Sequence, residues 1–127
     1  MKKRIRPTDA ELAILRVLWQ RGPSTVREVH GVLNEAKPTG YTTVLKFMQI
    51  MVDKDLVSRD ESPYAHIYKA RIPQEQTQRT LVADLLERAF EGSMSSLVVQ
   101  ALAAKRASKE ELSEIRKILK KYEGGAE

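Results

Sequence analysis

The stretch that decides the fold is YTTVLKFMQIMVDK, residues 41–54. Its apolar residues recur at positions i, i+3, i+4, i+7 and i+8, which predicts an amphipathic helix with one buried face. That face consists of Val44, Phe47, Met48, Met51 and Val52. The outward face then consists of Thr42, Leu45, Lys46, Gln49 and Asp53. Because lysine and glutamine pair with base edges in the major groove of DNA, we expect this face to contact bases.

Two shorter helices are predicted ahead of this one. Both begin with the S/T-x-x-E pattern of a capping box, in which the hydroxyl and the carboxylate accept hydrogen bonds from backbone N–H groups. The boxes run from Thr8 to Glu11 and from Thr25 to Glu28. The first helix has the apolar stripe Leu12, Leu15, Leu18 and Trp19, and ends at Gly22-Pro23. The second has Val26, Val29, Val32 and Leu33, and ends within residues 37–40.

Two short segments with β-branched and aromatic residues follow, at residues 56–61 and 66–72, around a turn at Ser62-Pro63. They are predicted to form a β-hairpin. Three helices and a hairpin make a winged helix-turn-helix, in which the third helix enters the major groove and the hairpin, or wing, reaches the flanking backbone. The predicted fold class is therefore mainly α, with this domain over residues 1–72.

The positive charge of the chain lies in the same segment. Residues 1–72 hold 13 Lys and Arg against 8 Asp and Glu, whereas residues 73–127 hold 9 of each kind. A basic segment suits the binding of a polyanion such as nucleic acid. A solvated basic surface without a ligand explains the charge alone equally well.

Residues 73–127 are predicted to form a helical dimerisation domain. Three amphipathic stripes within this segment exceed what a small domain with a closed core can cover, so a second copy is expected to cover them. The alternative is a monomer in which these helices pack back on the first domain. The expected dimer contacts are Leu81, Leu85, Leu86, Phe90, Met94, Leu97, Val98, Leu102, Leu112, Ile115 and Leu119.

Four motifs occur in a characteristic order: Asp9-Ala-Glu-Leu12 with Trp19, Gly40-Tyr-Thr-Thr-Val44, Asp55-Leu-Val57, and Met94-Ser-Ser-Leu-Val98. With them, nearly the whole chain resembles the BlaI/MecI/CopY family of penicillinase-type repressors. The resemblance implies a homodimeric winged-helix repressor that binds a palindromic operator in double-stranded DNA. It also implies an operator with TACA and TGTA elements.

The resemblance implies two routes of regulation. Copper-responsive members bind the metal through a cysteine pair motif near the C-terminus. This chain has no cysteine, so copper control by that route is not expected. In β-lactam-responsive members a membrane sensor-protease system leads to cleavage of an Asn-Phe bond after the Ser-Leu-Val motif. The corresponding bond here is Gln100-Ala101. We therefore expect cleavage of this bond only by a protease with a different sequence preference.

The expected DNA contacts fall into three groups. On the third helix they are Tyr41, Thr42, Thr43, Leu45, Lys46 and Gln49, where Leu45 is expected to meet a thymine methyl group. Ahead of the first helix they are Arg4 and Arg6, in a basic arm with Lys2 and Lys3. In the wing they are Arg59, Tyr64, His66 and Lys69, with Arg71 a further phosphate contact, although strand alternation prevents all of these from facing the DNA.

Other functions are less well supported by the sequence. There is no GxGxxG, P-loop, HExxH or GxSxG motif, so the chain is not expected to be an enzyme, to use a cofactor or to hold a metal. His30 is expected to be a surface or interhelical residue. No signal peptide or membrane-spanning run is evident, which favours a cytoplasmic protein. Two alternatives remain open: a winged-helix protein-interaction module without DNA binding, and a ligand-sensing regulator of the MarR type.

Overall fold

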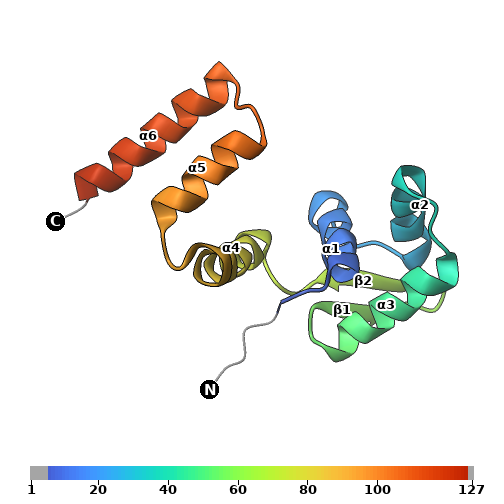
Figure 1. Ribbon diagram of the computed structural model, residues 1–127. Helices are drawn as coiled ribbons and strands as arrows, with labels where there is room; N and C mark the ends of the chain where they lie inside the picture. The colour runs from blue at the N-terminus through green and yellow to red at the C-terminus, as the bar shows by residue number, and fades with distance from the viewer. Residues whose placement is uncertain (1–5, 126–127) are drawn as a thin grey trace. The chain divides into compact units, whose positions relative to one another are not determined.

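The structure of the chain, a computed structural model, describes residues 6–125 (Figure 1). Six helices and two strands follow in the order α1 (Asp9–Arg21), α2 (Val26–Ala36), α3 (Tyr41–Asp53), β1 (Val57–Glu61), β2 (His66–Ala70), α4 (Gln74–Phe90), α5 (Met94–Ala104) and α6 (Lys109–Gly125) within these residues. The chain forms two compact units, up to residue 83 and from residue 84 onward. Helix α4 begins in the first unit and ends in the second.

Helices α1 and α2 both start at capping boxes, as predicted. The Thr8 hydroxyl accepts from the Glu11 N–H at 3.2 Å, and the Glu11 carboxylate accepts from the Thr8 N–H at 2.9 Å. The same two bonds join Thr25 and Glu28, at 3.1 and 2.8 Å. Helix α1 ends at Gly22, whose φ of 87° lies in the left-handed region that favours glycine.

The buried face of α3 is the predicted one. Val44, Met48 and Met51 are buried, and Phe47 and Val52 pack partly buried against the same core. On the predicted outward face of α3, Leu45 differs from the expectation. It was expected to be exposed, but it is half-buried and packs against the core, because the wing side of the domain covers this part of α3.

The two strands form the predicted antiparallel hairpin, with Val57 opposite Ala70 and Glu61 opposite His66. A further pairing was not expected. Ser24, in the connection between α1 and α2, exchanges two backbone hydrogen bonds with Tyr68, at 2.9 and 2.8 Å. This pairing attaches the wing to the helices.

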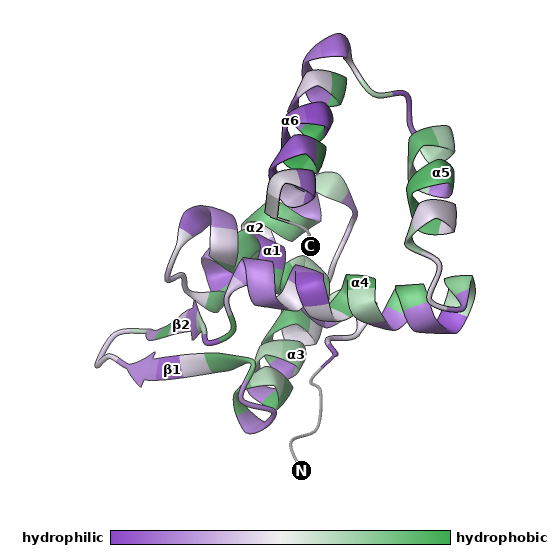
Figure 2. Cartoon of the chain, turned by 90° about the vertical axis from the view of Figure 1, so that its left-hand side faces the viewer, coloured by the Kyte–Doolittle hydropathy of each residue, from purple (hydrophilic) through white to green (hydrophobic). Residues whose placement is uncertain are grey.

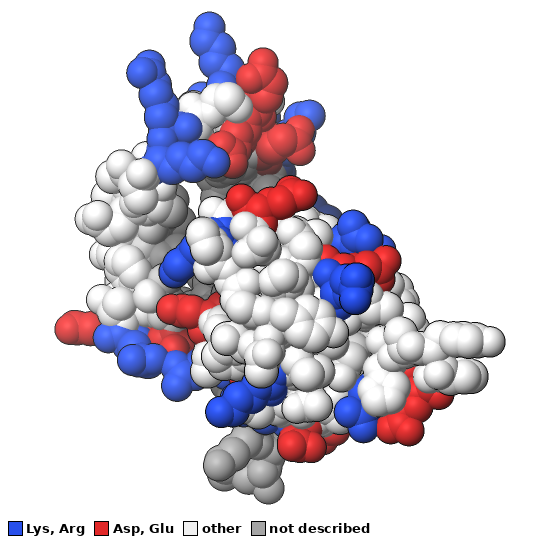
Figure 3. Space-filling view, turned by 90° about the vertical axis from the view of Figure 1, so that its right-hand side faces the viewer, with Lys and Arg blue, Asp and Glu red and all other residues white. Residues whose placement is uncertain are grey.

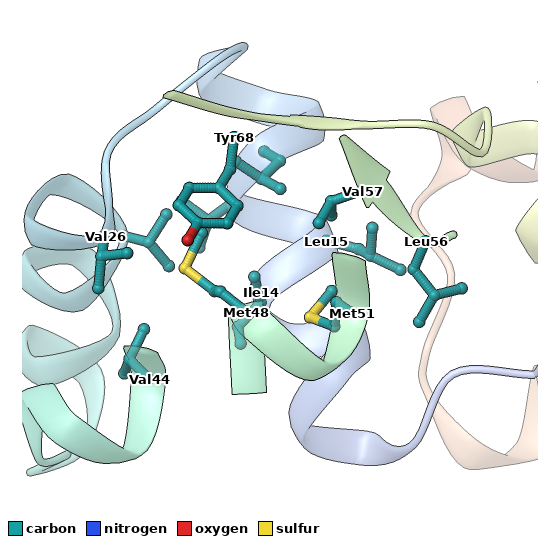
Figure 4. Close-up of a cluster of buried hydrophobic side chains, with 12 residues drawn as sticks. Ile14, Leu15, Val26, Val44, Met48, Met51, Leu56, Val57 and Tyr68 are labelled. Atoms are coloured by element: carbon teal, nitrogen blue, oxygen red, sulfur yellow. The ribbon is translucent and has the colours of Figure 1, made fainter. Parts of the chain in front are cut away.

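The core of the first unit lies between α1, α2, α3 and the hairpin (Figure 4). Tyr68 is the largest fully buried side chain among the described residues, at 1% exposed, and Met48 is 0% exposed. The stripe predicted for α1 is partly wrong: Ile14 and Val17 are buried, whereas Leu12 and Trp19 are only half-buried. Because α1 is covered by other helices and by the hairpin, its buried surface is broader than a single stripe. The Trp19 indole N–H donates to the Ile72 carbonyl at 3.0 Å.

The second unit is helical, as predicted, and exposes much apolar surface. Helix α5 has no buried residue, and most of its length is hydrophobic (Figure 2). The turn between α4 and α5 contains Gly92 with a φ of 81°. Helix α6 starts where the Ser108 hydroxyl accepts from the Glu111 N–H at 3.0 Å. Among the described residues, no helix is both long enough and apolar enough to cross a membrane.

A partly buried ion pair joins the start of α1 to the end of α3. Glu11 is 2% exposed, and its carboxylate lies 2.8 Å from the Lys54 ammonium. Burial by itself raises the pKa of Glu11, but the hydrogen bond from Lys54, the Thr8 backbone N–H and the positive charge of Lys54 outweigh it. The pKa of Glu11 therefore lies below its ordinary value. A carboxylate with a lowered pKa stabilises the fold above its unfolded-state pKa, and this stabilisation is lost as the pH falls through the folded-state pKa.

We predict that Lys54→Met lowers the free energy of unfolding by about 1–2 kcal/mol at neutral pH, because it leaves a buried carboxylate without its cation while Lys54 itself is half exposed. The measurement is urea unfolding at neutral pH and at an acidic pH below the lowered folded-state pKa of Glu11, where its carboxylate is protonated. The difference from wild type should shrink at the acidic pH. In a Glu11→Gln background, which keeps the cap without the charge, Lys54→Met should have little effect. An equal loss at both pH values would contradict this account.

Candidate nucleic-acid interface

The outward face of α3 presents a polar row. Thr42 and Thr43 lie in its first turn, and Lys46 and Gln49 follow at one-turn intervals; all four are exposed. Within the described residues, neither Lys46 nor Gln49 has a hydrogen bond or ion pair from its side chain. Both can therefore bind an external partner without breaking an internal contact.

A groove of about 550 Å³ lies beside this row. Its walls come from the start of α2, the start of α3 and the tip of the wing, and include Tyr41, Leu45, Tyr64 and His66. Helices carry a partial positive charge at their N-termini, so two helix starts at one groove favour an anion there. Of the described residues that line the groove, none is acidic. Figure 3 shows that the basic side chains on one face of the molecule are scattered among acidic and uncharged ones and form no continuous basic patch on that face.

Arg27 is a groove residue that the sequence analysis missed. It is the second residue of α2, it is exposed, and it lines the groove with His66. The signal was present in the sequence, because the Thr25–Glu28 capping box fixes Arg27 in the first turn of α2. What the sequence did not show is that this turn lies opposite the wing tip.

The wing divides the predicted contacts between its two faces. Side chains alternate along a strand, so Arg59 and His66 share a face with the buried Tyr68, whereas Lys69 lies on the opposite face. The Arg59 guanidinium lies 3.0 Å from the Glu61 carboxylate. Hydrogen bonds with Tyr68 and Glu61 raise the pKa of Arg59. Tyr64, at the tip, is 96% exposed.

The basic arm is described only in part. Arg6 is exposed just ahead of α1. Lys2, Lys3 and Arg4 lie outside the described residues. His30, expected at the surface or between helices, contacts the turn that leads into α3. Among residues 6–125, no cluster of His, Asp and Glu side chains is suited to hold a metal ion.

None of the expected dimer contacts is buried within the single chain. Leu81, Leu86, Phe90, Leu97, Leu112 and Ile115 are half-buried, and Leu85, Met94, Val98, Leu102 and Leu119 are exposed. The exposed fractions reach 67% for Met94 and 57% for Leu119. Gln100 and Ala101 are both exposed and lie within α5.

Comparison with known proteins gives relatives along almost the full chain. A transcriptional regulator named BlaI from Mycobacterium tuberculosis is 32% identical, over 98% of this chain and 91% of that protein. A penicillinase repressor from Bacillus licheniformis is 23% identical, over 96% of this chain and 95% of its own length.

A solved structure shares the fold of the first unit. The solution structure of the DNA-binding domain of the repressor BlaI matches with a TM-score of 0.51 and 22% identity, over 58% of this chain and 90% of that domain. The likeness supports a winged helix here. The sequence profile of the penicillinase repressor family matches residues 7–121. The chain therefore belongs to the penicillinase repressor family of transcriptional repressors.

Proposed function

We propose that this repressor is a homodimer that binds a palindromic DNA operator with one α3 helix in the major groove of each half-site. The observation that carries the proposal is the row of exposed side chains on α3, in which Lys46 and Gln49 have no hydrogen-bond or ion-pair partner among the described residues. Lysine donates to guanine O6 and N7, and glutamine pairs with adenine N6 and N7. Thr42 and Thr43, in the first turn, reach a phosphate or a base edge.

The groove beside α3 suits the sugar-phosphate backbone next to the bases that α3 reads. Arg27 supplies a cation there, and the start of α3, which has no side-chain cap, supplies free N–H groups. Tyr64 at the tip of the wing then meets the flanking DNA. On this proposal the repressor binds DNA in the cytoplasm, and repression requires no enzyme activity of its own.

The second unit supplies the dimer contact. Its apolar residues are exposed or half-buried in the single chain, and a partner copy that covers them gains about 25 cal/mol for each Å² of apolar surface removed from water. A dimer places two α3 helices about one DNA turn apart, on the order of 34 Å. Operator binding then becomes bivalent, and an intact dimer is needed for repression.

Cleavage between Gln100 and Ala101 is the proposed route of induction, through a membrane sensor-protease system. Both residues are exposed, and cleavage at this bond would divide α5. Loss of the helix that follows would weaken the dimer and so release the operator.

DNA binding is tested by fluorescence anisotropy with a TACA/TGTA inverted-repeat duplex and a scrambled duplex, each at two salt concentrations. Lys46→Ala should weaken operator binding by about 1–3 kcal/mol, because it removes a base contact. Arg27→Ala should weaken binding to both duplexes similarly and reduce the salt dependence, because it removes a phosphate contact. Lys69→Ala is the matched control, since Lys69 lies on the other face of the wing. If Lys69→Ala lost operator binding while Lys46→Ala and Arg27→Ala kept it, the proposed interface would be wrong.

Dimerisation is tested with Leu85→Asp, measured by light scattering and by anisotropy. Leu85 is 49% exposed in the single chain, so the charge should disrupt a dimer without unfolding the protein. The variant should be monomeric and should lose operator affinity on the order of 10²-fold. Leu85→Met serves as the control that keeps the apolar contact. A monomeric wild type with full operator affinity would rule out the dimer.

Induction by cleavage predicts two fragments, residues 1–100 and 101–127, in the source cells after derepression. Mass spectrometry of the immunoprecipitated protein detects them. Derepression with only intact protein would show that another signal acts.

A further inference from the structure

Two side chains of α2 hold the turn that leads into α3. The His30 ring nitrogen Nε2 lies 2.8 Å from the Thr39 carbonyl oxygen, to which it can donate. The Asn34 side-chain oxygen accepts from the Thr39 N–H at 2.9 Å. Both backbone groups of Thr39, two residues before α3 begins, are therefore bonded to α2.

Helix α3 depends on these contacts more than its neighbours do. The N-cap of α3 is Gly40, which has no side chain to accept a bond from the first turn, and that turn has no acidic residue. The starts of α1 and α2 are instead fixed by complete capping boxes. Since the sequence of α3 does not fix its own start, tertiary contacts to the preceding turn must do so.

His30 also contacts the first residue of α3. Its ring lies edge-to-face against Tyr41, with 5.6 Å between ring centroids and 74° between ring planes. Tyr41 is 45% exposed and lines the groove beside the wing tip. One side chain thus holds both the backbone before α3 and the exposed ring at its start.

We propose that His30, assisted by Asn34, is a positioning residue for operator recognition. The inference rests on the proposed function. Hydrogen bonds to base edges require donor and acceptor at 2.7–3.2 Å in a fixed direction. Attraction to phosphate depends on charge and tolerates small displacements. A shift of the α3 start would therefore weaken binding to the operator more than binding to random DNA.

The test uses two substitutions in the full chain that separate the contacts of His30. His30→Phe keeps an aromatic ring against Tyr41 but cannot donate to the Thr39 carbonyl. His30→Gln keeps a donor but loses the ring. Anisotropy titrations give the dissociation constants for the inverted-repeat duplex and the scrambled duplex, and their ratio is the readout. His30→Phe should lower this specificity ratio roughly three- to tenfold, the value of one hydrogen bond, and His30→Gln should lower it less.

Val29→Ala controls for a general loss of stability. Val29 is fully buried on the same helix and is not part of the contacts to Thr39. It should lower the Tm without changing the specificity ratio at a temperature where the protein is folded. An unchanged ratio in His30→Phe would overturn the proposal, and so would equal weakening toward both duplexes. A wild type that does not prefer the inverted repeat would instead contradict the proposed function.

Discussion

The pairing of Ser24 with Tyr68 is the contact on which the arrangement of the first unit depends. Both residues are 1% exposed, and they exchange two backbone hydrogen bonds. Ser24 directly precedes the N-cap of α2, and its hydroxyl donates to the Gly22 carbonyl at 2.9 Å. Because the groove lies between the helix starts and the wing tip, this pairing sets the position of the wing relative to α2 and α3.

Two polar contacts of α1 act together with this pairing. Near its start, Glu11 is bonded to Lys54 at the end of α3, and near its end, Trp19 donates to the Ile72 carbonyl after the wing. Helix α1 is therefore connected to both elements that border the interface. Apolar packing fills the space between these contacts, but it is not directional. The hydrogen-bonded pairs therefore fix the orientation of α1 relative to α3 and the wing.

Much of this unit could be predicted from the sequence, because its signals are local. Capping boxes and the buried stripe of α3 depend on residues within one or two helical turns, and both are confirmed. The pairs that could not be predicted join distant segments. Ser24 and Tyr68 are 44 positions apart, and Glu11 and Lys54 are 43 apart. The burial of Leu45 and the place of Arg27 follow from the same long-range packing, which periodicity does not report.

The charges of the wing limit what it contributes to DNA binding. Its strands hold Arg59 and Lys69 against Asp60 and Glu61, so their formal charges cancel. Arg59 is also paired with Glu61. The residues at the tip, Ser62-Pro-Tyr-Ala65, carry no charge. In the proposed complex, attraction to phosphate therefore comes from outside the wing, for example from Arg27 at the start of α2. The wing then acts through contacts of shape and polarity, with Tyr64 exposed at its tip.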